Sequence, residues 1–257
     1  MSVPNVVVHR DADILAKAVA ARIITRLVDV QAAKGSASLV LTGGTVGIAT
    51  LAAIAATPAR DAVDWRHLDI WWGDERYLPT GDPERNETGA RQALLDHVDV
   101  DPERVHVMLG PDSGLSAEES AEAYAAELQK AARPEDHGPV PSFDVTLLGM
   151  GPDAHVASLF PGMPALYDTR PVVAVHGSPK PPPTRISLTL PAIQASREVW
   201  VVAAGEEKSG AVRLALSESG HVQVPAAGAH GRLRTLFLLD RAAAGKIPPG
   251  LGRIASP

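Results

Sequence analysis

The sequence predicts a single three-layer α/β/α domain over residues 1–257, built on a largely parallel, Rossmann-like sheet. Short β-branched runs alternate with alanine-rich helical patterns, which is typical of a parallel sheet with helices on its faces. The 257 residues show no internal repeat and no break in composition that would require a domain boundary. A chain of this length can bury a substantial core in one domain.

In the first half of the chain, helix starts are the clearest local signals. Asp11 is expected to cap the first helix, because apolar residues recur at helical spacing directly after it. Ser116 and Glu119 form the capping box of a helix that extends to about Ala132. The expected strands here are Val6–His9, Ser38–Leu41, Leu68–Trp72 and Val105–Leu109, with an alanine-rich helix over Ile48–Ala56.

In the second half, apolar runs predict a central strand over Phe143–Leu148 and a short helix that Pro161 ends after about two turns. Gly205–Leu216 has a helical pattern. The same sheet is expected to continue through Val172–Val175, Arg185–Leu190, Glu198–Ala203 and Thr235–Leu239.

Composition narrows the class of partner. The formal net charge of −6 argues against nucleic acid as the main partner. No apolar run approaches the ~20 residues that cross a bilayer, and the first residues lack the features of a signal peptide. The absence of cysteine fits a reducing compartment. We expect a cytoplasmic monomer or weak homo-oligomer that binds a small molecule and contacts neither nucleic acid nor membrane.

Three polar clusters follow expected strands, where ligands of parallel sheets bind. The first is LTGGTVG at 41–47, whose glycines allow backbone N–H groups to approach an anion at a helix start. It is not a Walker loop, because no GKS/T follows, and Thr42 stands where a dinucleotide fingerprint begins with glycine. A phosphate site on Gly43, Gly44 and Thr45 and a simple tight turn both remain open.

The second cluster is WWGDERYLPTGDPERN at 71–86. Asp74 and Arg76 leave the strand together, and a guanidinium there can stabilise an oxyanion or hold a carboxylate. An ordinary acidic loop is the alternative. Asn86 opens the next helix and is expected to be its N-cap, with substrate contact as a further interpretation.

The third cluster is LLGMGPDAHVASLFPG at 147–162, where Gly149, Gly151 and Ala154 match G-x-G-x-x-A. Dinucleotide binding is disfavoured, because Pro152 interrupts the turn and the following helix is short. Asp153 stands two residues before His155, so one turn can aim both side chains into a cleft. This pattern favours a catalytic histidine with an orienting carboxylate.

Together, these clusters resemble the 6-phosphogluconolactonase family from the first helix to the last strand. That family shares its fold with glucosamine-6-phosphate deaminases and ribose-5-phosphate isomerases. The resemblance implies hydrolysis of 6-phospho-D-glucono-1,5-lactone in the oxidative pentose phosphate pathway, with no metal or organic cofactor. It is carried by TGGT (42–45), WGDER (72–76), Asn86, GMGPDAHVASLFPG (149–162), KPPPTRISLT (180–189) and GEEK (205–208).

Roles follow from the resemblance and the chemistry of lactones. His155 is expected to be the general base, oriented by Asp153. Arg76 is expected to stabilise the oxyanion, with Asp74 positioning Arg76 or a sugar hydroxyl. The expected substrate-binding residues, mostly for the phosphate, are Gly43, Gly44, Thr45, Asn86, Arg185 and Lys208.

Two departures from the family pattern bear on these roles. The family usually has a proline two residues after GG-[ST], where this chain has Val46 and then Gly47. Ala154 replaces the usual glycine between the aspartate and the histidine, which implies that position 154 need not adopt a positive φ.

Two other functions are compatible with this fold: a glucosamine-6-phosphate deaminase and a non-catalytic sugar-phosphate sensor. Glucosamine-6-phosphate deaminases carry a glutamate shortly after the corresponding histidine, whereas no carboxylate stands between His155 and Asp168. A non-catalytic sugar-phosphate sensor would need a DNA-binding module, for which Met1–Arg10 leaves no room before the first strand. Both alternatives are disfavoured.

Overall fold

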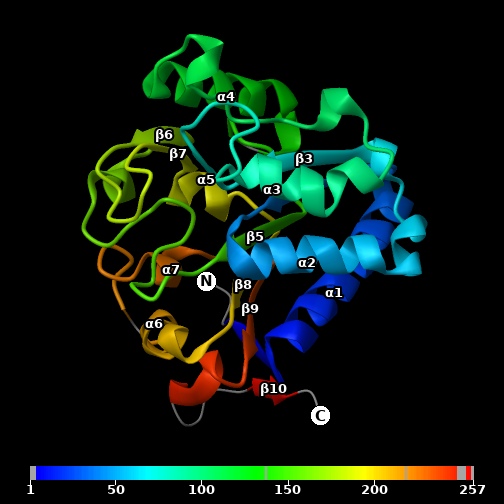
Figure 1. Cartoon of the computed structure of the whole chain (residues 1–257), viewed down its shortest axis with the longest axis vertical. Coiled ribbons are helices and arrows are strands. Elements are labelled where there is room, and N and C mark those ends of the chain that lie inside the picture. Colours follow the sequence, from blue (N-terminus) through cyan, green and yellow to red (C-terminus); the bar gives the residue numbers. More distant parts are fainter. Residues whose placement is uncertain (1–3, 137, 218, 248–252, 256–257) are drawn as a thin grey trace.

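A seven-stranded parallel sheet forms the centre of the molecule (Figure 1). The computed structural model describes residues 4–136, 138–217, 219–247 and 253–255. The strand order is β10-β1-β9-β8-β5-β2-β3, and every adjacent pair is parallel. The strands are β1 (Asn5–His9), β2 (Ala37–Leu41), β3 (Leu68–Trp72), β5 (Val145–Gly149), β8 (Glu198–Ala203), β9 (Arg234–Asp240) and β10 (Arg253–Ala255). The predicted α/β class with a largely parallel sheet is therefore confirmed.

Helices cover both faces of this sheet, because its central strands are apolar on both sides. Along β8, Val199 and Val201 belong to one buried cluster, whereas Trp200 and Val202 belong to the other. The helices are α1 (Ala12–Lys34), α2 (Gly44–Ala56), α3 (Asn86–Ala93), α4 (Ala117–Ala131), α5 (Leu190–Gln194), α6 (Ser209–Ala215) and α7 (Pro225–Gly228). The first cluster includes residues of α4, α5, α6 and α7, and the second includes residues of α1, α2 and α3. Among the described residues, no helix is both long and apolar enough to cross a membrane.

The helix starts predicted from the capping residues Asp11 and Ser116 are confirmed. Asp11 accepts a 2.9 Å hydrogen bond from the N–H of Ile14 at the start of α1. Ser116 and Glu119 form both bonds of the capping box that opens α4. The predicted helical segment at 205–216 consists of a 3₁₀ turn at Glu206–Lys208 followed by α6.

The predicted place of Val172–Val175 and Arg185–Leu190 in the main sheet is wrong. Instead, β4 (Asp74–Arg76), β7 (Arg185–Leu188) and β6 (Val172–Val175) form a separate antiparallel sheet in that order. The loop between β6 and β7 covers only residues 176–184, which suits an antiparallel pair and is too short for a parallel crossover. Because β4 follows β3 after a single glycine, this small sheet lies directly beside the end of β3.

The predicted strand at Val105–Leu109 is also wrong. The segment runs beside β3 but makes only one bridge, between Ile70 and Val105. Beyond this bridge, the backbone groups of β3 and of the 105–109 segment form hydrogen bonds with side chains of α4 instead of with each other. Tyr124 Oη accepts the N–H of Trp72 at 2.9 Å and donates to its carbonyl at 3.3 Å. Ser120 Oγ donates to the carbonyl of Leu109 at 2.8 Å.

The loop after β5 differs from its prediction in two ways. Residues 153–161 form turns rather than a helix. Ala154 adopts φ 66° and Ala157 φ 50°, so the expectation that position 154 avoids positive φ is wrong. Hydrogen bonds hold Ala154 in this conformation, since its N–H donates to Gly151 at 3.0 Å and its carbonyl accepts from Ala226 at 3.0 Å. These bonds act against a left-handed penalty of roughly 1–2 kcal/mol for a residue with a Cβ atom.

We predict that Tyr124→Phe destabilises the protein without changing its fold. The variant leaves the buried N–H of Trp72 without its partner, which typically costs about 1–3 kcal/mol. Thermal unfolding would show this as a melting temperature lower by several degrees. Tyr167→Phe is the matched control, because Tyr167 is 68% exposed. Equal melting temperatures for the two variants would contradict a stabilising role for the Tyr124 hydroxyl.

Candidate active site

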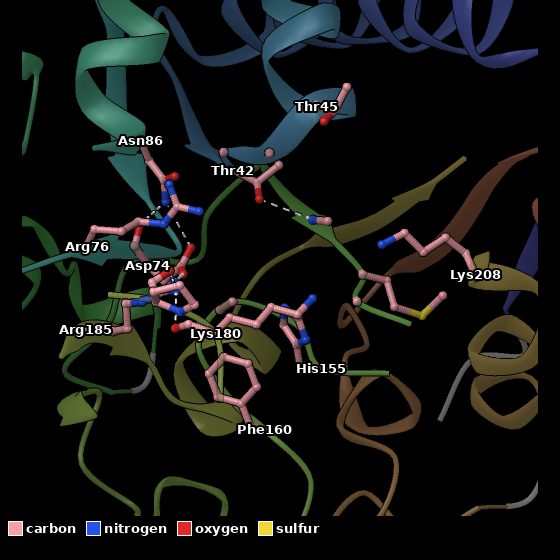
Figure 2. Close-up of a pocket in the computed structure, with 17 residues that line it drawn as sticks. Thr42, Thr45, Asp74, Arg76, Asn86, His155, Phe160, Lys180, Arg185 and Lys208 are labelled. Atoms are coloured by element: carbon pink, nitrogen blue, oxygen red, sulfur yellow. Dashed lines mark hydrogen bonds and ion pairs between the residues drawn. The ribbon is translucent and has the colours of Figure 1, made fainter. Parts of the chain in front are cut away.

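A cavity of about 320 Å³ lies at the carboxyl ends of the central strands (Figure 2). Since the strands are parallel, the segments that follow β2, β3, β5 and β8 all leave the sheet at this edge. β7 and the proline-rich loop before it complete the wall. The lining residues are Thr42, Gly43, Gly44, Thr45, Asp74, Arg76, Asn86, Gly149, Met150, Gly151, His155, Ala157, Phe160, Lys180, Pro181, Arg185 and Lys208.

The glycine loop after β2 forms one wall, where α2 begins. Gly43 is the N-cap of α2 and offers no side chain, so backbone N–H groups at the positive end of this helix are left for a ligand. A Cβ atom on Gly43 would lie 1.9 Å from Oδ1 of Asn86, so glycine is required here by close approach. Thr42 Oγ1 accepts the N–H of Gly149 at 3.2 Å, which joins this loop to the end of β5.

Asp74 and Asn86 form a buried polar pair beside this loop. Asn86 Nδ2 donates to the backbone carbonyl of Asp74 at 2.9 Å and to its Oδ1 at 3.3 Å. Ser158 Oγ donates to Oδ2 of Asp74 at 2.7 Å. The prediction that Asn86 is an N-cap is wrong, because Asn86 is the first residue of α3 and the N-cap is Arg85. The side chain of Asn86 instead reaches back to β4.

Arg76 presents its guanidinium to the cavity. Its Nη1 donates to the carbonyl of Glu84 at 2.5 Å, so a backbone group rather than a carboxylate holds the side chain. Its buried Nε has no hydrogen-bond partner among the described residues. A buried donor without a partner costs free energy.

His155 and Asp153 form a close pair in the loop after β5. His155 Nδ1 lies 2.5 Å from Oδ1 of Asp153, and the ring of Phe160 packs against the imidazole with 4.5 Å between ring centroids. Partial burial acts to raise the pKa of Asp153, but the hydrogen bond and charge of His155 outweigh it and lower the pKa to about 2. His155 lines the cavity, whereas Asp153 does not line it and contacts the far side of the imidazole. The bond at Nδ1 leaves Nε2 for a water or a substrate.

Gly151 makes this arrangement possible. A Cβ atom at Gly151 would lie 2.1 Å from Nδ1 of His155 and 2.4 Å from Oδ1 of Asp153. The second glycine of the G-x-G match is therefore explained by the space that this pair needs.

Besides Arg76, three basic side chains line the cavity: Lys180, Arg185 and Lys208. Arg185 is only 5% exposed, and its Nε and Nη2 donate to the carbonyls of Lys180, Pro181 and Pro182 at 2.8–3.0 Å. Nη1 of Arg185 lies 4.0 Å from Oδ2 of Asp74. Arg185 thus holds the proline-rich loop in place and keeps one nitrogen toward the cavity.

Lys208 is half-buried at the end of the 3₁₀ turn after β8. Burial and the positive charge of Lys180 both lower the pKa of Lys208, while Glu207 and Asp153 oppose them. Two ammonium groups close enough to repel each other favour an anion between them.

The structure brings the sequence-predicted residues together, since all of them except Asp153 line the cavity and Asp153 bonds to His155. Lys180 and Phe160 are lining residues to which the sequence assigned no role. Lys180 belongs to the KPPPTRISLT motif at 180–189, but the sequence alone does not show that its side chain faces the cavity. Within the described residues, no group of three or more His, Cys, Asp or Glu side chains is arranged to hold a metal ion.

Comparisons with known proteins show the family of the chain. The family model of glucosamine-6-phosphate isomerases/6-phosphogluconolactonase matches residues 10–237. A 6-phosphogluconolactonase from Streptomyces coelicolor is 62% identical over 251 residues, which cover 96% of each chain. One from Mycobacterium tuberculosis is 48% identical over 245 residues, covering 95% of this chain and 98% of the relative.

Solved structures show the same fold. The 6-phosphogluconolactonase from Trypanosoma brucei superposes with a TM-score of 0.79 at 28% identity, over 95% of this chain and 99% of that one. A monomeric glucosamine-6-phosphate deaminase superposes with a TM-score of 0.77 at 21% identity, over 93% of this chain and 99% of that one, and shares the fold. The chain belongs to the glucosamine-6-phosphate isomerase/6-phosphogluconolactonase family.

Proposed function

We propose that this chain hydrolyses 6-phospho-D-glucono-1,5-lactone to 6-phospho-D-gluconate in the oxidative pentose phosphate pathway. Relatives at 62% and 48% identity bear the name of this activity. The single observation that carries the proposal is the Asp153–His155 pair, whose histidine lines the same cavity as Arg76 and the basic side chains Lys180, Arg185 and Lys208. A lactone is an activated ester, so a positioned water, a base and a stabilised oxyanion suffice.

His155 Nε2 takes a proton from water while the water oxygen bonds to the lactone carbonyl carbon. Asp153 holds the proton on Nδ1 and stabilises the imidazolium that results. The carbonyl oxygen becomes an oxyanion, which accepts hydrogen bonds from the Arg76 guanidinium. When the bond from this carbon to the ring oxygen breaks, the ring oxygen takes the proton from His155. The product carries a carboxyl group and a new hydroxyl.

The phosphate end of the substrate is proposed to bind between the start of α2 and the two lysines. Gly43, Gly44 and Thr45 offer backbone N–H groups, and Lys180 and Lys208 offer charge. Arg185 contributes through Nη1 and by holding the loop that carries Lys180. Asp74 and Asn86 are proposed to face the sugar hydroxyls, from the part of the cavity wall between the phosphate site and the reacting carbonyl.

The deaminase reading lacks a carboxylate in the right place. Asp74 is the one acidic side chain that lines the cavity among the described residues, and it is bonded to Ser158 and Asn86. No acidic residue stands between His155 and Asp168 to assist ring opening. This supports lactone hydrolysis over deamination.

We further infer that residues 1–257 act as one domain, because the two apolar clusters pack on opposite faces of one sheet. The cysteine-free composition supports a cytoplasmic location, and a monomer or weak homo-oligomer is proposed. The decisive assay measures hydrolysis of freshly generated 6-phosphogluconolactone, corrected for its spontaneous reaction. No acceleration by the purified protein would overturn the proposed function.

The first prediction concerns the base. His155→Ala should lower kcat by roughly 10²–10⁴-fold with little change in KM, because a general base acts in the transition state. Affinity for 6-phosphogluconate, measured by calorimetry, should stay close to that of the wild type. A variant with near wild-type kcat would remove His155 from the mechanism.

The second prediction concerns the shape of the cation at position 76. Arg76→Lys keeps the charge but loses the planar fork, so kcat should fall on the order of 10²-fold. Arg66→Lys serves as the control, because Arg66 is exposed and pairs with Asp99. Full activity of Arg76→Lys would mean that only the charge at this position contributes.

The third prediction separates phosphate binding from chemistry. Lys180→Ala and Lys208→Ala should each lower kcat/KM for the phosphorylated lactone by about ten- to a hundredfold, since a charge-assisted hydrogen bond contributes roughly 1.5–3 kcal/mol. Turnover of unphosphorylated gluconolactone should change little. Lys130→Ala, on the exposed face of α4, is the control. Equal losses on both lactones would place the phosphate elsewhere.

A further inference from the structure

Glu75 is the member of the Asp74–Arg76 strand that the chemistry above does not use. Successive side chains of a strand point to opposite sides. Asp74 and Arg76 line the cavity, whereas Glu75 points away from it and is only 2% exposed. A carboxylate is costly to bury, and burial raises the pKa of Glu75 to about 7 although Arg85 and nearby N–H groups oppose the shift. Its presence inside the protein therefore needs an explanation.

The contacts of Glu75 supply one. Its Oε1 accepts the backbone N–H of Arg76 at 2.8 Å and that of Asn86 at 2.7 Å. Its Oε2 accepts the N–H of Glu87 at 2.8 Å. Asn86 and Glu87 are the first two residues of α3, whose own N-cap residue, Arg85, forms no side-chain capping bond. Glu75 thus caps α3 from a neighbouring strand.

Buried charges surround this carboxylate and balance it. Arg85 lies 3.9 Å from Glu75 and 3.0 Å from Glu87, and it donates to the carbonyls of Leu78 and Met108 at 2.9 and 2.7 Å. Arg91 pairs with the other oxygen of Glu87 at 2.9 Å. The segments around Arg76, Asn86 and Met108 are therefore tied to one buried network.

We propose that Glu75 is a positioning residue, whose carboxylate fixes the backbone of Arg76 and Asn86 and so sets the place of their side chains in the cavity. This inference rests on the lactonase function proposed above. A carboxylate suits the task because it accepts three N–H bonds and donates none. Glutamine in the same place would turn an amide N–H toward one of these N–H groups.

The experiment is a double-mutant cycle between positions 75 and 76. Glu75→Gln should lower kcat about 10- to 100-fold with a small change in KM, because a displacement of about 1 Å at a reacting group costs up to roughly 10²-fold. In an Arg76→Ala background, Glu75→Gln should lower kcat by less than about twofold further, because Arg76 is the one group that Glu75 positions for catalysis and Asn86 is proposed to contact the substrate in binding. A Glu75→Gln loss of equal size in both backgrounds would overturn the proposal.

Glu198→Gln is the matched control. Glu198 is a buried carboxylate at the opposite end of the sheet, 4% exposed, with Arg26 at 3.0 Å and Trp200 Nε1 at 3.0 Å. Its variant should lower the melting temperature while kcat stays unchanged. An equal fall of kcat in Glu198→Gln would show that loss of any buried carboxylate disturbs the site and would overturn a specific role for Glu75.

A failure to fold and a failure of the proposed function are separated as follows. If Glu75→Gln does not fold, the cycle is repeated with Glu75→Asp, which keeps the charge. Failure of both variants to fold would assign Glu75 to stability and overturn the proposal. The wild-type assay is measured first. Absence of lactonase activity there refutes the proposed function, whereas full wild-type activity with an unchanged kcat in Glu75→Gln refutes only the role of Glu75.

Discussion

The site depends on the common direction of the strands in the large sheet. Because every neighbouring pair is parallel, the segments after β2, β3, β5 and β8 emerge at one edge, although the ends of β2 and β8 are 162 residues apart in the chain. Each segment delivers a different chemical group there. The first gives backbone N–H groups, the second a guanidinium, the third an imidazole and the fourth an ammonium. A sheet of mixed direction would send some of these groups to the opposite edge.

The strands end at this edge, so the backbone N–H and carbonyl groups there no longer have partners within the sheet. Several residues in and around the site supply hydrogen bonds to these groups. Thr42 bonds to the end of β5, and Asn86 bonds to the backbone of β4. Asp240 likewise accepts the N–H of Gly205 at 3.1 Å. These fixed bonds hold the cavity wall before any substrate arrives, which is the preorganisation that electrostatic catalysis requires.

The sequence predicted features that depend on residues close together in the chain. Capping at Asp11 and Ser116 was confirmed, because each cap is decided within three or four residues. The parallel direction of the central strands followed from the alternation of apolar runs with helical patterns, whereas their order in the sheet was not predicted. The cluster of site residues was predicted because strand ends of a parallel sheet converge.

Features that depend on distant partners could not be predicted in this way. The pairing of β7 with β4 joins segments about 110 residues apart, and no local pattern in β7 distinguishes it from a strand of the main sheet. The positive φ of Ala154 is held by a bond from Ala226, and alanine carries no signal of such a conformation. Asn86 looked like a cap because its partner, Asp74, becomes a neighbour only in the folded chain.

The hydroxyl of Tyr124 has a consequence for how copies of this protein can meet. β3 is the last strand on its side of the sheet, and an open edge of this kind can recruit a strand from another molecule. Here the segment at 105–109 lies along that edge, and Tyr124 occupies both backbone groups of Trp72. The edge is therefore closed from within the chain. Self-association at this side has to use side chains of helices and loops, so strand-by-strand growth into fibres has no starting point at β3.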